Sequence, residues 1–233
     1  GRPATLFVFG GKYFMKIPAP RLPSQYTPLT DAAAFVEQAR LSFDGELDLR
    51  QVSIEHLSFS EASFPRLSLR GVRVIACRFV GCDLSGADWA DVQFVDCDFS
   101  GCDFTQTSFR RCSFSECKAV GTQWTDAALL EVAMQNCNFS YSNFASCALR
   151  KCMFSKCALP HTRFFSCSLQ DCAFQPSDWT GATFFQTPLA ALDLRAVQLD
   201  GLSADLESLR GAQVTRSQAA DLAHLFGLRI APD

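Results

Sequence analysis

The chain has 233 residues, 48% of them hydrophobic, so it can bury the core of one domain and is too apolar to be disordered. Its net charge of −3 provides no excess of basic residues for contacts with phosphates, and direct nucleic-acid binding is not expected. No apolar run is long enough to span a membrane, and the apolar residues 6–9 lack the pattern of a secretory signal.

The first 46 residues lack the regularity of the rest of the chain. Residues 1–30 are expected to be irregular or extended, because prolines recur between Pro18 and Pro28. Met15 is the expected natural start, so that residues 1–14 precede the native sequence. Residues 31–46 are expected to form a helix, over residues 31–41, and a lead-in that together cover the N-terminal end of the repeat that follows.

From residue 47 to residue 214 one five-residue pattern repeats without a break. Every fifth residue from Leu49 to Val214 is hydrophobic, and these positions include all three tryptophans. A second row, two residues earlier, holds small or aliphatic residues, with Glu207 as its one exception. An α-helix cannot keep a period of five on one face, whereas two inward residues separated by one outward residue form a short strand. The pattern therefore predicts a chain that turns every five residues and winds into a solenoid.

The repeat resembles the pentapeptide-repeat family, whose consensus is A-(D/N)-L-x-x. The resemblance is carried by Cys82-Asp83-Leu84, Ala87-Asp88-Trp89, Cys97-Asp98-Phe99 and Cys102-Asp103-Phe104. It implies an all-β solenoid, a right-handed quadrilateral β-helix of 20-residue coils with short capping helices at the N- and C-termini. Five cysteines at intervals of 20 residues, from Cys77 to Cys157, support coils of this length stacked in register, with a rise of roughly 4.8 Å.

All 12 cysteines lie in the second row of the pattern. Pairs five residues apart, such as Cys77 and Cys82, differ from the tighter C-x₂-C pairs of tetrahedral zinc sites. Their place in one inward row indicates small core residues rather than metal ligands. Parallel, stacked side chains lie farther apart at Cβ than a relaxed disulfide requires, so we expect reduced thiols, no metal and a cytoplasmic protein.

No catalytic constellation is visible in the sequence. His56 and His161 fall on outward corners of the pattern, and none of the histidines, including His224, has an evident nucleophile or carboxylate partner. Phosphate loops, nucleotide fingerprints and nucleophile elbows are also missing. The sequence therefore predicts a protein that is not an enzyme, with no catalytic residues and no cofactor.

Acidic residues are concentrated between Phe79 and Phe109, a stretch that has no lysine or arginine. We call its six aspartates the acidic collar: Asp83, Asp88, Asp91, Asp96, Asp98 and Asp103. Four of them occupy the consensus Asp or Asn position and need no function, but Asp91 and Asp96 do not. The collar is therefore either a product of the repeat or a surface that a basic partner recognises.

Two further features of the repeat lead to expectations. Between Val132 and Gln170 there is no acidic residue, and this stretch carries the basic residues Arg150, Lys151, Lys156 and Arg163. Ala119 interrupts the row of large inward residues, so the core is expected to be underfilled there and to accept phenylalanine.

Residues 215–233 are expected to form a C-terminal helix and tail that cap the solenoid or join two chains. Thr215 and Gln218 fit a capping box, and Gly227 is placed to end the helix. An apolar stripe follows the cap, and a strand-like tail follows the helix. The predicted dimer interface comprises Ala219, Leu222, Ala223, Phe226, Leu228 and Ile230. The stripe can instead cover the last coil of its own chain, and an isologous dimer would combine both roles.

The segments Leu209-Arg210-Gly211-Ala212-Gln213-Val214 and Leu225-Phe226-Gly227-Leu228 are similar to the ending of the Qnr-type (quinolone-resistance) and MfpA-like pentapeptide-repeat proteins. The resemblance implies a homodimer joined through its C-terminal helices. It also implies binding to bacterial DNA gyrase or topoisomerase IV by mimicry of duplex DNA. The unbroken register predicts no projecting loops, which favours the MfpA-like form.

Two hypotheses about function follow from the sequence. The first is a DNA mimic that modulates a topoisomerase or protects it from a toxin or a quinolone-like drug. The basic stretch at residues 150–163 weakens simple mimicry, because a mimic of DNA should be acidic along its whole length. The alternative is a scaffold or interaction protein with a different protein partner, since fold alone does not determine function.

Overall fold

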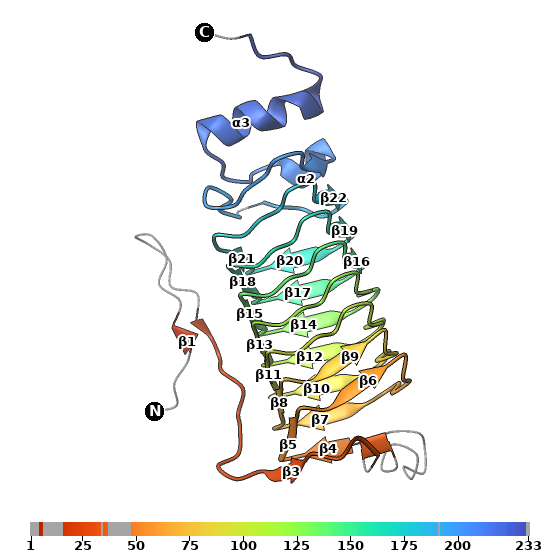
Figure 1. The fold of residues 1–233 in the computed structure, drawn as a ribbon. Helices are drawn as coiled ribbons and strands as arrows, with labels where there is room; N and C mark the ends of the chain where they lie inside the picture. Colours follow the sequence, from red (N-terminus) through yellow and green to blue (C-terminus); the bar gives the residue numbers. More distant parts are fainter. Residues whose placement is uncertain (1–4, 7–15, 34, 37–47, 191, 232–233) are drawn as a thin grey trace.

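The structure, a computed structural model, describes residues 5–6, 16–33, 35–36, 48–190 and 192–231. The chain winds into a long four-sided solenoid, with the N-terminal segment beside it and a helix across its C-terminal end (Figure 1). Neighbouring strands of the solenoid pair in parallel at a separation of 20 residues, as Asp88 does with Ser108, and only residues 27–29 pair at another separation, 25 residues, with residues 52–54. The all-β solenoid with 20-residue coils that the sequence predicts is confirmed.

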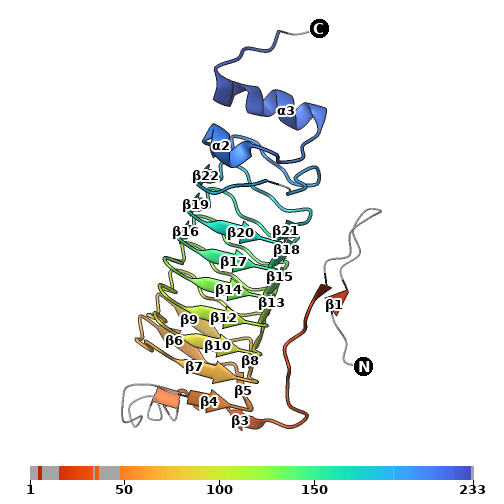
Figure 2. The same ribbon diagram turned by 180° about the vertical axis from the view of Figure 1, so that it is seen from behind.

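The solenoid strands line up in columns that form the four faces, and the same columns are visible from behind (Figure 2). Face 1 consists of β4 (Asp48–Arg50), β7 (Ser68–Arg70), β10 (Asp88–Ala90), β12 (Ser108–Arg110), β14 (Ala128–Leu130), β17 (Ala148–Arg150) and β20 (Ser168–Gln170). Face 2 consists of β3 (Thr27–Leu29), β5 (Val52–Glu55), β8 (Arg73–Ile75), β11 (Gln93–Val95), β13 (Ser113–Ser115), β15 (Ala133–Gln135), β18 (Met153–Ser155) and β21 (Ala173–Phe174).

Faces 3 and 4 contain fewer regular strands, and isolated parallel bridges continue them in the same register. Face 3 contains β6 (Ser58–Ser60) and β9 (Arg78–Val80), and bridges such as Asp98 to Lys118 extend it. Face 4 contains β16 (Asn143–Ala145), β19 (Arg163–Phe165), β22 (Thr183–Phe185) and β23 (Ser203–Ala204). The backbone register therefore holds on all four sides.

The corners of the coils are made by residues with left-handed backbone conformation. They recur five residues apart, as at Gln106 (φ 58°) and Arg111 (φ 52°), and most of them are not glycine. Glycine occupies the same position at other corners, such as Gly101 and Gly121. A non-glycine residue pays roughly 1–2 kcal/mol for this conformation, so the packing of the coils must stabilise it.

Large inward side chains stack on their counterparts in the next coil. Under face 4, the rings of Phe144 and Phe164 lie 4.7 Å apart, and Phe164 and Phe184 repeat this spacing with nearly parallel planes. This distance matches the separation of neighbouring strands, roughly 4.8 Å, so the in-register backbone produces the aromatic stacks. The core is a set of parallel side-chain ladders inside the solenoid.

The expectation that the core is underfilled at Ala119 does not take account of Trp124 in the same coil. Ala119 is buried, and the Trp124 ring lies 4.4 Å from Phe104 and 6.3 Å from Phe139. The Trp124 indole Nε1 also donates to Thr122 Oγ1, which fixes the orientation of the ring. Phe139 is the register neighbour of Ala119 in the next coil, so we expect the Trp124 ring beside it to extend toward the space that a phenylalanine at position 119 would need.

All 12 cysteines are buried and free. Cys112 Sγ contacts the carbonyl oxygen of Trp89 in the preceding coil at 3.4 Å, and the Thr107 hydroxyl donates to Leu84 in the equivalent way. Cysteine and threonine therefore share one task in this row, that of a small side chain that donates to a buried carbonyl. Burial raises the pKa of Cys112 to about 12 and that of Cys77 to about 11, so these thiols are protonated at neutral pH.

Near its C-terminal end the solenoid replaces a strand with a short helix. Helix α2 (Leu206–Leu209) is capped by Asp205, which accepts a hydrogen bond from the Ser208 amide. Ser208 takes the buried position, and Glu207 is exposed. This explains the one charged residue in the second row, because Glu207 does not point inward. The bridge between Asp193 and Gln213 then restores the register before the chain leaves the solenoid.

Helix α3 (Arg216–Leu222) and the 3₁₀ turn η1 (Ala223–Phe226) cross the last coil. The predicted capping box is confirmed, because the Thr215 side chain accepts from the Gln218 amide and the Gln218 side chain accepts from the Thr215 amide. Gly227 ends the turn in a left-handed conformation, as the sequence indicates. Gln218 is buried and its Nε2 donates to the carbonyl oxygens of Leu194 and Val197. Helix α3 therefore closes the solenoid by satisfying backbone groups of the last coil.

The predicted apolar stripe is wrong in part. Leu222 and Ala223 are buried within their own chain, whereas Ala219 and Phe226 are exposed. The buried side of α3 includes Gln218, a polar residue that the apolar pattern does not predict to be buried. Leu228 and Ile230 are exposed as well, and the described residues 228–231 form no strand. Leu222 and Ala223 are thus covered by their own chain, as in the alternative that the stripe covers the last coil.

The N-terminal segment, residues 16–29, which we call the arm, lies along the outside of the solenoid (Figures 1 and 2). Strand β3 adds to face 2 beside β5, and β2 (Lys16–Ile17) pairs antiparallel with β1 (Thr5–Leu6). Ile17 is buried against Ala133 and Met153 on the outer side of face 2. The arm therefore reaches from the first coil to coils more than 100 residues further along the chain.

The N-terminal helix predicted over residues 31–41 lies mostly outside the described residues. Residues 32, 33, 35 and 36 are helical, and residues 34 and 37–47 are not described. Phe35 is fully buried, with its ring 5.0 Å from Phe59 and 5.1 Å from Phe64. Phe35 thus covers the aromatic rings of the first coil.

The left-handed corners predict opposite effects for glycine and valine. Replacing the exposed Gln106 by glycine is expected to raise the free energy of unfolding by roughly 0.5 kcal/mol. Glycine removes the strain of the left-handed backbone, and the greater entropy of the unfolded chain offsets only part of this gain. Gln106→Val is expected to lower the free energy of unfolding by about 1–3 kcal/mol, since a β-branched residue fits this conformation poorly. Chemical denaturation measures both. Ser108→Gly, within strand β12, is the control and should destabilise; a stabilising effect there would contradict the role of the corner.

Because Ala119 is buried and the Trp124 ring lies 6.3 Å from Phe139, the register neighbour of Ala119, Ala119→Phe is expected to lower the free energy of unfolding by about 1–3 kcal/mol. Adding Trp124→Leu should recover part of this loss, because the smaller side chain makes room for the new ring. Denaturation of the two single variants and the double variant measures the coupling. Strictly additive effects would show that the two residues do not share this space.

Candidate interaction surfaces

The acidic collar forms a ring around the solenoid rather than a patch on one side. Asp88 lies on face 1 in β10, Asp98 lies on face 3, and Asp83 and Asp103 are bridge partners on face 4. Asp91 and Asp96 occupy left-handed corners on either side of face 2. Of the six, only Asp83 and Asp103 are stacked directly on each other, so the collar has no single strongly acidic face.

Asp91 is the most firmly bound member of the collar. Its two carboxylate oxygens accept from Arg111 Nε and Nη2 at 2.7 and 2.6 Å, and Oδ1 also accepts from the Arg21 backbone amide at 2.8 Å. Both side chains of the ion pair are only 16% exposed. Burial alone would raise the pKa of Asp91. The hydrogen bonds from Arg111 and the Arg21 amide outweigh burial and hold this pKa below its usual value. Asp91 therefore joins two coils and fixes the arm to them.

Other collar residues also have partners. Asp88 pairs with Arg70, and Asp98 lies 3.9 Å from both Arg78 and Lys118. Asp83 accepts from the Ser63 hydroxyl and the Ser85 amide, and Asp103 accepts from the Thr105 amide. Asp96 is exposed at its corner. Much of the collar's negative charge is thus offset by cations from the neighbouring coils.

The sequence contains the signal for this pairing, at a separation of 20 residues. Arg111 follows Asp91 by 20 positions, Lys118 follows Asp98 by 20, and Arg78 precedes Asp98 by 20. A stretch that lacks basic residues can therefore still have basic neighbours above and below it in the solenoid. Counting charges along the chain overestimates the acidity of such a surface.

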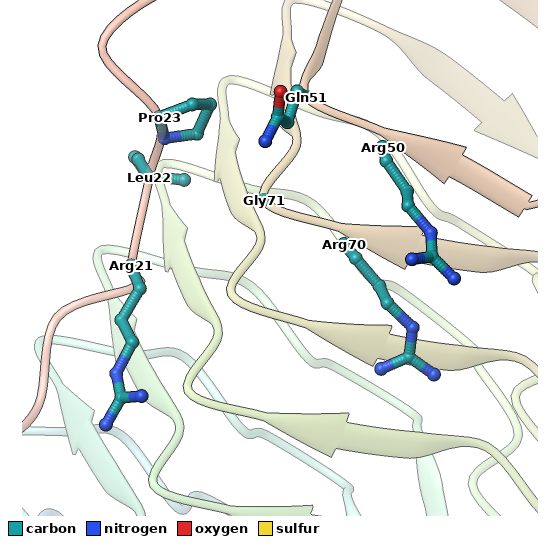
Figure 3. A pocket seen from close by; sticks show the side chains of 7 residues that line it. All are labelled: Arg21, Leu22, Pro23, Arg50, Gln51, Arg70 and Gly71. Atoms are coloured by element: carbon teal, nitrogen blue, oxygen red, sulfur yellow. The ribbon is translucent and has the colours of Figure 1, made fainter.

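A cleft of about 300 Å³ lies where the arm passes the first coils (Figure 3). It is lined by Arg21, Leu22, Pro23, Arg50, Gln51, Arg70 and Gly71. Arg50 and Arg70 extend side by side, and each is paired with an aspartate, Asp48 and Asp88 respectively. Arg21 extends away from them in Figure 3, so the three guanidinium groups do not converge on one point. The seven lining residues include no nucleophile and no general base.

The three histidines are not brought together. His56 is an exposed corner residue, His161 stacks on Tyr141, and His224 Nδ1 lies 2.6 Å from the Asp221 carbonyl oxygen in the C-terminal helix. Within the described residues, no group of three His, Cys, Asp or Glu side chains could hold a metal ion. No helix in this part of the chain is long and apolar enough to cross a membrane.

Inspection of the sequence missed a second surface, on the C-terminal half of the solenoid. Tyr141, Phe165 and Phe185 are exposed, although large aromatic residues elsewhere in the repeat point into the core. All three stand at outward positions of the five-residue pattern, where small or polar residues are usual in this chain. Aromatic residues in outward positions are therefore the signal that could have located this surface.

Comparison with known proteins bears on the fold. Residues 87–164 match the family model described as Pentapeptide repeat region. A search of curated proteins found no match. A trypsin-treated form of QnrB1, a plasmid-mediated fluoroquinolone resistance protein, aligns with a TM-score of 0.50 and 24% identity, over 89% of this chain and 99% of that one. HetL, a pentapeptide repeat protein from the cyanobacterium Nostoc sp. strain PCC 7120, aligns with a TM-score of 0.43 and 16% identity, over 79% of this chain and 96% of that one.

The contacts of Asp91 predict that it stabilises both the solenoid and the arm. Asp91→Ala is expected to lower the free energy of unfolding by about 2–3 kcal/mol, because Arg111 is left mostly buried without its partner. Amide exchange at Arg21 and Leu22 should become faster. Asp96→Ala, at an exposed corner, is the matched control and should change stability by less than about 0.5 kcal/mol. Equal effects of the two variants would contradict the anchoring role.

The contribution of Asp91 to the free energy of unfolding should depend on pH. Because the pKa of Asp91 is lower in the folded protein, its stabilising effect is complete above the ordinary aspartate value of about 4. The effect is lost as the pH falls through the lower folded-state value. The difference in stability between the natural protein and Asp91→Ala should therefore shrink in acid, which denaturation at several pH values measures.

Proposed function

This chain is a pentapeptide-repeat protein, and from that premise we propose that it is a non-enzymatic DNA mimic that binds bacterial DNA gyrase or topoisomerase IV. In this role it modulates the enzyme or protects it from a toxin or a quinolone-like drug. The observation that carries the proposal is the solenoid itself, which resembles QnrB1, a fluoroquinolone resistance protein, over nearly the whole length of that chain. The C-terminal sequence resemblance to the Qnr-type and MfpA-like proteins supports the same assignment.

The proposed protein is a homodimer joined at its C-terminal end. Helix α3 closes the solenoid with Gln218 and Leu222, and leaves Phe226, Leu228 and Ile230 exposed beyond it. Exposed apolar residues clustered in one terminal segment suit contact with a second copy. With Ala219 they form the proposed interface, and a two-fold dimer would join two solenoids into one longer body.

The proposed role of the acidic collar is to meet the basic surface with which a topoisomerase holds DNA. Asp96 supports this role best, because it is exposed and the repeat consensus does not require an acid at its position. Asp91 is assigned to stability instead, since its carboxylate is occupied by Arg111 and the arm. We place the protein in the cytoplasm, a location that the free thiols support.

The alternative is a scaffold that binds a different protein. The pairing of collar aspartates with Arg70, Arg78, Arg111 and Lys118 favours it, because these pairs reduce the negative charge that mimicry of DNA requires. Under this alternative the protein would have no effect on either topoisomerase.

A supercoiling assay with gyrase and a decatenation assay with topoisomerase IV test the proposal, each with and without a quinolone. Micromolar protein is expected to inhibit the enzyme or to restore its activity in the presence of the drug. Asp96→Lys should weaken the effect, and Asp126→Lys, at another exposed left-handed corner, is the matched control. Phe226→Asp should convert the dimer to a monomer in sedimentation. Absence of any effect on both enzymes would overturn the proposal in favour of the scaffold.

A further inference from the structure

A surface of unusual chemistry lies on the C-terminal half of the solenoid, at face 4 and the corner that leads into it. We call it the aromatic patch, and its residues are Tyr141, His161, Arg163, Phe165 and Phe185. Their coils follow one another in the stack, because each of the positions 141, 161 and 181 begins the same segment of a coil. Tyr141 is 63% exposed, Phe165 51% and Phe185 42%. These side chains are placed where they contribute little to the core.

Two members of the patch are held in a defined stack. The rings of Tyr141 and His161 lie 5.0 Å apart with an angle of 15° between their planes. On the other side of His161, a Cβ atom at Gly181 would stand 2.6 Å from His161 Nδ1, so only glycine leaves room for the ring. The backbone is also left-handed at all three positions. The two rings are therefore ordered against the corner rather than free in solvent.

The other members lie beside this stack on face 4. Phe165 in β19 and Phe185 in β22 are direct partners in the parallel ladder. Arg163 lies two residues before Phe165 in the same strand, so both side chains point to the same, outer side. Tyrosine, histidine, arginine and two phenylalanines thus stand at neighbouring outward positions of three successive coils.

The patch differs from the rest of the solenoid in its charge balance. The outward residues of the three coil segments 141–146, 161–166 and 181–186 include no acid: Tyr141, Asn143, Ala145, Ser146, His161, Arg163, Phe165, Ser166, Gly181, Thr183, Phe185 and Gln186. Arg111 has a carboxylate one coil away, but the register neighbours of Arg163 are Asn143 and Thr183. Among the ion pairs of the described residues, none includes Arg163.

This composition fits a protein partner better than nucleic acid or a second copy. Exposed tyrosine and arginine, with phenylalanine around them, are the residues that concentrate binding energy in protein interfaces. A single arginine on a chain of net charge −3 provides too few phosphate contacts for nucleic acid. A two-fold contact of the patch with itself would bring two Arg163 side chains together, and the one carboxylate in register with the patch, Asp205, is already hydrogen-bonded to Gln186 and Ser208.

We propose that the aromatic patch is a second docking surface for the topoisomerase, where an apolar area of the enzyme that carries carboxylates packs against Phe165 and Phe185 and pairs with Arg163. This inference rests on the proposed function. The DNA-binding surface of the enzyme is basic and suits the collar, whereas it would repel Arg163. The patch therefore contacts a part of the enzyme outside the DNA path, and the two surfaces of the solenoid bind two regions of opposite charge.

The experiment measures the affinity of the full chain for gyrase and topoisomerase IV by biolayer interferometry. Phe165→Ser combined with Phe185→Ser, and separately Arg163→Glu, should each weaken binding by about tenfold or more. Arg150→Glu is the matched control, because Arg150 is also an exposed strand residue of the acid-free stretch, on face 1. It should change affinity by less than about twofold, as expected for a charge outside the interface. All variants are outward, and unchanged thermal unfolding checks that they fold.

Each outcome supports or overturns the inference. If the natural protein binds and the patch variants bind equally well, the role of the patch as a docking surface is overturned and the proposed function stands. If the natural protein binds neither enzyme, the proposed function is overturned, and so is the assignment of a topoisomerase as the partner of the aromatic patch. Binding of a labelled single-stranded oligonucleotide that is lost in Arg163→Glu would assign the patch to nucleic acid instead. A change of oligomeric state in Arg163→Glu, measured by sedimentation, would assign it to self-association.

Discussion

The constraint on which the whole structure depends is the parallel register of 20 residues between successive coils. Backbone hydrogen bonds impose it, and each side chain then has as its nearest neighbours the residues 20 positions before and after it. Aromatic rings stack in columns because of this register, and small donors such as Cys112 reach carbonyl groups of the coil below. The same register decides which charges meet on the outside, so the core and the surface follow one rule.

The sequence predicts this arrangement well where the pattern is strict. The inward rows, the coil length and the capping box at Thr215 are all visible in the residues, because periodicity and caps are local signals. Properties that depend on contacts between coils are not visible in the same way. The partner of Asp91 is distant along the chain, and so is Phe104, the ring of the preceding coil on which Trp124 stacks. The buried face of α3 also differs from the apolar pattern, since the buried Gln218 satisfies carbonyl groups that no apolar pattern reveals.

The outer surface is divided by chemistry along the length of the solenoid. The acidic collar surrounds coils in the N-terminal half, and cations from adjacent coils partly neutralise it. The aromatic patch lies in the C-terminal half, on one side only, and the one acid in register with it, Asp205, is hydrogen-bonded to the Gln186 and Ser208 amides. A uniform rod of negative charge would imitate DNA along its whole length. This protein instead combines an encircling acidic band with a directional apolar surface, and so has a defined orientation toward any partner that contacts both.

The two hydrogen bonds from Gln218 to the last coil have a consequence for the chain in concentrated solution. In-register parallel stacking has no natural end, and the same geometry builds amyloid fibrils, in which each layer is a template for the next. An uncovered last coil would offer its free carbonyl groups to another molecule, as an exposed strand edge does. Gln218 donates to the carbonyl oxygens of Leu194 and Val197 within its own chain, so these two acceptors are occupied at the last coil. One glutamine thus helps to separate a finite folded protein from an end-to-end polymer.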